Sequence, residues 1–177
     1  MADGRSAEEL TPSEVAGLLA ASAAALAAEV AVLPERVLAF HPAPGEWCVK
    51  EVIGHLIEAE RRGFAGRIRT ILAEDRPRLQ AWDQNEVARA RRDCGRDAAS
   101  LLQEFQARRR DGVALTERLR PADLARGGQH PKVGWLTVAD LLQEWVHHDR
   151  NHLRQVLANV QAWVWPAMGN AQGFADE

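Results

Sequence analysis

Apolar residues recur at helical spacing in four long stretches of the chain. This spacing predicts helices over about 12–32, 49–74, 97–119 and 137–161. Capping boxes open the first and the last of these helices, formed by Thr11 with Glu14 and by Thr137 with Asp140. A proline, which cannot continue a helix, stands shortly after each of the first three stretches.

No strand is predicted, because period-two alternation is absent and β-branched residues are scattered. Four helices of about 20 residues each favour an all-α fold, a four-helix bundle. The links over 33–47, 75–96 and 120–136 are long, so crossover connections are open to the chain and simple up-down topology is not assured. The middle link is expected to hold a short helix near 84–91.

The length fits one domain. We expect a single domain over 1–177, with a core at about 12–160 and a C-terminal tail over 162–177 that turns polar and frays. The stretch from Val15 to Ala28 is too short and too rich in alanine to span a bilayer, and no signal-peptide pattern precedes it.

Composition narrows the function classes. The net charge of −3 argues against nucleic acid as a partner. The arginine clusters are interpreted as solvated helix faces: Arg89, Arg91 and Arg92, and Arg108, Arg109 and Arg110. Two cysteines, Cys48 and Cys94, cannot build a disulfide framework, so a soluble, cytoplasmic protein with no membrane partner is expected.

Three histidines form the candidate site. His148 and His152 are four residues apart on the last predicted helix, so both rings face the same side, and His55 lies on the second helix. Three imidazoles around one divalent ion would leave a coordination position open, as in reactive metal centres. Glu51 and Glu58 flank His55 at helical spacing and are expected to accept hydrogen bonds from its ring.

The same residues have a simpler interpretation. Histidines at the border of an apolar stripe often serve packing alone, and a pair four apart arises by chance in many helices. The residue after His148 is Asp149 rather than glutamate, so the metalloprotease pattern is absent. Cys48, at the start of the second helix, is interpreted as a cap or packing residue rather than a nucleophile.

Several segments together resemble the DinB-like superfamily. They are HPAPGEWCVKEVIGHL at 41–56, PRLQAWDQ at 77–84, GWLTV at 134–138 and HDRNHLRQ at 148–155. The likeness covers roughly 12–160. It implies a four-helix bundle with a non-sequential helix order, frequently a homodimer, and one divalent ion, most often zinc or nickel, on His55, His148 and His152. Cys48 is a departure, because relatives commonly carry a serine cap there.

Some members of this family use a low-molecular-weight thiol such as bacillithiol or mycothiol. The leading hypothesis is therefore a metal-dependent S-transferase in which a thiolate attacks a small electrophile, with hydrolysis by activated water as a near variant. No catalytic residue beyond the ligands is assigned. Trp82 and Asp83 are expected at the mouth of the site.

The competing hypothesis is a non-catalytic, stress-related metal-binding or scaffold domain. A structural zinc normally has four protein ligands. No fourth ligand stands out, because His147 faces away and His41 and His130 lie in predicted loops. A metal-free bundle whose histidines only pack is the third alternative.

Overall fold

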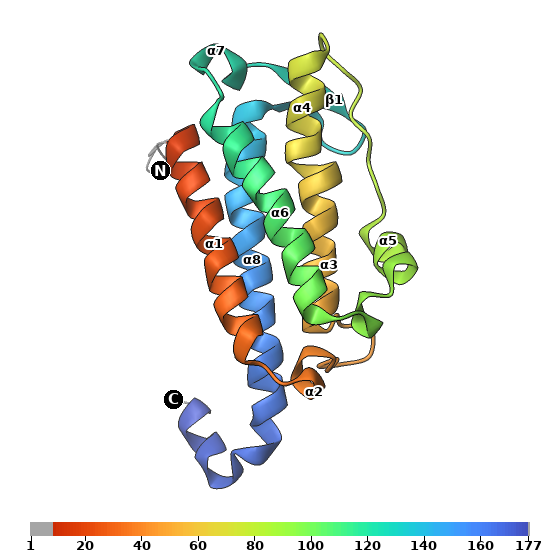
Figure 1. Ribbon diagram of the computed structural model, residues 1–177, viewed down its shortest axis with the longest axis vertical. Helices are drawn as coiled ribbons and strands as arrows, with labels where there is room; N and C mark the ends of the chain where they lie inside the picture. The colour runs from red at the N-terminus through yellow and green to blue at the C-terminus, as the bar shows by residue number, and fades with distance from the viewer. Residues whose placement is uncertain (1–8, 177) are drawn as a thin grey trace, which may run out of the picture.

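Four long helical rods form the body of the computed structural model, which describes residues 9–176 (Figure 1). The rods are α1 (Pro12–Val32), α3 (Val49–Glu58) continued by α4 (Ala65–Ala73), α6 (Ala98–Glu117) and α8 (Val138–Val164). The all-α four-helix bundle predicted from the sequence is confirmed. The remaining helical elements are α2 (Glu35–Leu38), α5 (Gln84–Arg91), η2 (Asp93–Gly95), α7 (Pro121–Leu124), η3 (Trp165–Ala167) and η4 (Gly169–Asp176).

Helix boundaries follow the capping chemistry. The Thr11 side chain accepts from the Glu14 backbone N–H, and the Glu14 carboxylate accepts from Thr11 in return. Thr137 and Asp140 repeat this arrangement at α8. The short helix expected near 84–91 is also present as α5. The tail differs from expectation: α8 continues to Val164 and is followed by the 3₁₀ segments η3 and η4.

The helices are not arranged in chain order. α1 packs against α6 and α8, and α3 packs against the same two helices on the other side. In Figure 1, α3–α4 and α6 rise in the same direction, while α1 and α8 descend. Two parallel neighbours need a connection that returns along the bundle, and the link that carries α5 supplies it.

The second rod is interrupted, whereas the sequence predicted one continuous helix. A π-helical turn, η1 (Ala59–Gly63), lies between α3 and α4, and the Phe64 N–H donates to Ala59 O at 2.9 Å. Such turns insert one extra residue and rotate the helix faces on either side. Here the insertion turns Glu60 into the core, where it is 2 % exposed.

A small β-hairpin contradicts the prediction that the chain has no strand. β1 (Gly127–His130) pairs antiparallel with β2 (Gly134–Thr137) at the start of α8. The amino-acid pattern does not predict β1, because this strand contains no β-branched residue. Close packing selects this strand instead: a Cβ on Gly127 would stand 2.5 Å from Leu136 O, and one on Gly128 would stand 2.9 Å from Pro77 O.

α1 is long and apolar enough to meet the length and hydropathy criteria for a membrane span. Helices in the core of a bundle meet the same criteria. α1 is such a helix, because it buries Val15, Leu19, Leu26 and Val30 against its neighbours.

Arg109 is buried, which corrects its assignment to a solvated face. Its guanidinium donates to Leu19 O on α1, to Glu60 on η1 and to both carboxylate oxygens of Asp149 on α8. Trp145 Nε1 donates to the same Glu60 oxygen at 3.0 Å. One side chain of α6 therefore joins all four rods. Its neighbours Arg108 and Arg110 are exposed, as predicted.

Arg109→Ala should lower the free energy of unfolding by roughly 3–5 kcal/mol, because it leaves two buried carboxylates without their cation. Arg108→Ala is the matched control on the same helix and should change stability by about 0.5 kcal/mol or less. Urea denaturation followed by circular dichroism measures both. Equal effects of the two substitutions would contradict the bridging role of Arg109.

Candidate metal centre

α3 and α8 bring the three predicted histidines together. One ring nitrogen from each of His55, His148 and His152 lies within 4.8 Å of the others. The Nε2 atoms of His55 and His148 are 3.0 Å apart. Two nitrogens bonded to one zinc ion at about 2.0–2.1 Å stand roughly 3 Å apart, so this spacing suits a shared divalent ion.

Gln155 fixes the orientation of His152. The His152 Nδ1–H donates to Gln155 Oε1 at 2.9 Å, one helical turn further along α8. This bond places the proton on Nδ1 and leaves the Nε2 lone pair free. The Nδ1 atoms of His55 and His148 are buried and have no hydrogen-bond partner among residues 9–176.

The expected acceptors for His55 are engaged elsewhere, so that prediction was wrong. Glu51 accepts from the Cys48 backbone N–H at 2.9 Å, within the cap of α3. Glu58 pairs with Arg62 and Arg91. Helical spacing predicted both carboxylates near the His55 ring, but Glu51 caps α3 and Glu58 pairs with two arginines instead.

Burial keeps the imidazoles neutral. It lowers the pKa of His55 to about 3, with a smaller effect from His152, and it lowers the pKa of His148 to about 2 with help from the other two rings. Burial also lowers the pKa of His152. Neutral imidazole is the form that binds metal ions, so these ligands need lose no proton at cellular pH.

Aromatic side chains surround the histidines. The Trp47 ring centroid lies 4.9 Å from that of His55, and the Trp82 ring stacks on His55 at 5.7 Å. Phe64 meets His148 edge-on at 5.1 Å. Trp47 is itself held by Asn159, whose side-chain amide donates to the Trp47 carbonyl at 2.8 Å. These rings place apolar surface beside the imidazoles.

A cavity of about 780 Å³ adjoins the histidines. His55 and His148 form part of its wall, and Trp82 and Asp83 line it, as expected from the sequence. The cavity is further lined by Ala59, Gly63, Phe64, Arg67, Ala81, Gln84, Asn85, His130, Lys132 and Glu144. The volume accommodates a small-molecule ligand beside the imidazoles.

Sequence reasoning missed the basic residues of this cavity. Arg67 on α4 extends its guanidinium to 3.2 Å from His130 Nε2, and its Nε atom is buried without a partner among residues 9–176. Burial, opposed by Glu144, lowers the pKa of Arg67. Lys132 comes from the hairpin turn. No local motif links these positions, because only the packing of the hairpin against α4 brings them together.

A family model described as DinB superfamily matches residues 8–156. The chain belongs to the DinB superfamily. This agrees with the resemblance seen in the histidine segments.

Two relatives of this DinB protein carry descriptions that mention a metal. A protein of Oceanobacillus iheyensis named "putative metal-dependent hydrolase" is 23 % identical over 121 residues, which cover 68 % of this chain and 69 % of that protein. The solved structure of YfiT from Bacillus subtilis superposes with a TM-score of 0.79 at 20 % identity, covering 91 % of this chain and 92 % of that one. YfiT is described as "a probable metal-dependent hydrolase with an unusual four-helix bundle topology". At 20 % identity, the likeness to YfiT shows a shared fold and nothing more.

Gln155→Leu should weaken Ni²⁺ binding about 10- to 100-fold, because His152 loses the acceptor that orients its ring. Gln161→Leu, at an exposed position of the same helix, is the matched control and should bind as the wild type does. Isothermal titration calorimetry measures both affinities. Unchanged binding by the Gln155 variant would show that the His152 ring needs no such partner.

Proposed function

We propose that this DinB protein is a metal-dependent enzyme that transfers a low-molecular-weight thiol to a small electrophile. The observation that carries the proposal is the convergence of three neutral imidazoles, two of which, His55 and His148, line an open cavity of about 780 Å³. His55, His148 and His152 would hold the ion, and zinc or nickel suits three imidazoles. Such an ion lowers the pKa of a bound thiol and so supplies a thiolate near neutral pH.

The chain's own residues would bind and orient the thiol. A second cavity of about 530 Å³ adjoins the first and shares Arg67, Ala81 and Trp82 with it. Its wall also carries Arg61, Arg62 and Arg78. This run of guanidinium groups favours a thiol with an anionic body that extends past Trp82, away from the histidines.

The reaction consumes only the two substrates. The thiol proton passes to solvent, the sulfur forms a bond to the electrophilic carbon, and the leaving group departs with its bonding electron pair. Trp47, Trp82 and Phe64 would exclude bulk water from the sulfur, and Arg67 would hold the anionic part of the thiol.

Hydrolysis is the second candidate, and the description of the Oceanobacillus relative favours it. The same three histidines would then hold an ion that activates a water molecule as the nucleophile. In either case a homodimer remains a prediction, as does a cytoplasmic location.

Ligand binding distinguishes the two reactions. Protein loaded with Zn²⁺ or Ni²⁺ is heated with glutathione, cysteine, coenzyme A, bacillithiol or mycothiol, and separately with chromogenic esters. One thiol should stabilise the loaded protein by about 2.7 kcal/mol at a hundredfold excess over its Kd. His148→Ala should abolish this effect, and His147→Ala, at an exposed position beside it, should not.

Ester cleavage without any thiol effect would favour the hydrolase. A metal-loaded protein that neither binds a thiol nor cleaves an ester would overturn both reactions and leave the scaffold hypothesis.

Arg67→Leu should weaken binding of the stabilising thiol by roughly 1.5–3 kcal/mol, about 10- to 150-fold, because one charge-assisted hydrogen bond is lost. Arg69→Leu removes an exposed charge two residues along the same helix and should leave the affinity unchanged. Metal content should be the same in both variants, which separates thiol recognition from damage to the metal centre. Equal affinities would contradict the role given to Arg67.

A further inference from the structure

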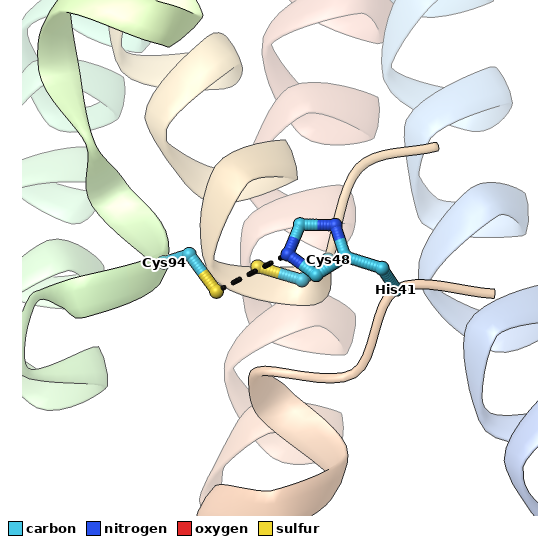
Figure 2. A group of neighbouring side chains, drawn as sticks. All are labelled: His41, Cys48 and Cys94. Atoms are coloured by element: carbon cyan, nitrogen blue, oxygen red, sulfur yellow. Dashed lines mark hydrogen bonds between the residues drawn. The ribbon is translucent and has the colours of Figure 1, made fainter. Parts of the chain in front are cut away.

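A second group of side chains that could hold a metal ion lies near Trp47. It consists of His41 from the link before α3, Cys48 at the N-terminus of α3, and Cys94 from η2. One donor atom from each lies within 4.8 Å of the others. Figure 2 shows the two sulfur atoms and the imidazole ring meeting from three separate segments.

The tautomer of His41 suits it as a ligand. Its Nδ1–H donates to the Glu46 carbonyl at 2.8 Å, with the Glu51 carboxylate also 3.5 Å from the same nitrogen. Nε2 therefore carries the lone pair, and it faces Cys94 Sγ at 3.5 Å. An imidazole nitrogen at about 2.0–2.1 Å and a sulfur at about 2.3 Å from one zinc ion, at a tetrahedral angle, stand roughly 3.5 Å apart.

The fold holds Cys94 in place. The carboxylate of the preceding Asp93 is buried against Gly54 of α3, where a Cβ would collide with it. Arg91 and Arg96 both bind this carboxylate. Cys94 is thereby fixed beside α3 by groups that do not belong to the cluster, as a preorganised ligand requires.

Cys48 lies at a helix N-terminus, where the helix dipole favours a negatively charged sulfur. It is 0 % exposed, while Cys94 is half-buried and His41 is exposed. Burial raises the pKa of the Cys48 thiol, which makes it a poor nucleophile when no cation is near. A cavity of about 430 Å³ lies beside His41, and Trp47 and Glu51 also line it.

We propose that His41, Cys48 and Cys94 form a second metal site, which takes a thiophilic divalent ion, Zn²⁺, and leaves its fourth position to solvent. Two thiolates and one imidazole are a ligand set of zinc sites that keep an open position. The site shares no ligand with the three-histidine centre, so the two can be tested separately.

Cobalt(II) titration of the fully reduced whole chain tests the proposal, because cobalt bound to thiolates gives a charge-transfer band in the near ultraviolet. The band should appear in the wild type and persist in His148→Ala. Cys94→Ser should lose it. Losing a residue that only hydrogen-bonds to a metal ligand weakens metal binding roughly 10- to 100-fold. His41→Ala should weaken cobalt binding by more than this, because it removes a ligand. His147→Ala is the histidine control and should leave the band unchanged.

Cys94 and His41 are the preferred positions for substitution, because Cys48 is in the core and its variants risk misfolding. Circular dichroism confirms that each variant is folded. A reduced wild type without the band at saturating cobalt overturns the proposal. So does a band that survives in folded Cys94→Ser, or a Cys48–Cys94 disulfide whose reduction yields no cobalt binding.

Discussion

The buried guanidinium of Arg109 holds the bundle together, and the candidate metal centre depends on it. Its partners lie on the other three rods, and one of them, Asp149, directly follows His148 in α8. A slip of α8 along its axis would move Asp149 away from Arg109 and would carry His148 with it. A buried cation between two carboxylates tolerates little misalignment, because a displaced charge in the core has no water to replace its partner. The register of α8, and with it the His148–His152 pair, is fixed in this way.

The local features of the fold could be read from the sequence, and the long-range ones could not. Thr11 with Glu14 and Thr137 with Asp140 mark helix starts through contacts three residues apart, so a linear pattern is sufficient to find them. The i, i+4 spacing of His148 and His152 is equally local. His55 was a candidate from its place on the second predicted helix, and the family resemblance supported it as the third ligand. The burial of Arg109 has no such signal, because Arg108 and Arg110 beside it are exposed.

Long-range contacts also explain why some residues at the two candidate metal sites could not be predicted from the sequence. Arg67 and Lys132 meet in one cavity only because the hairpin packs near α4. His41, Cys48 and Cys94 come from three segments whose convergence depends on Asp93 fitting against Gly54. The π-turn at Ala59–Gly63 also depends on a distant partner, because its Glu60 accepts a hydrogen bond from Arg109 on α6. Each of these features depends on partners that are distant in the chain.

The parallel arrangement of α3–α4 and α6 has a consequence for how such proteins diversify. It obliges the chain to return along the outside of the bundle, and this returning strap carries Trp82, Asp83 and Cys94. Connecting segments accept insertions and exchanges far more readily than packed helices do. Ligand preference can therefore change through the strap alone, while the helices that bear the imidazoles stay as they are.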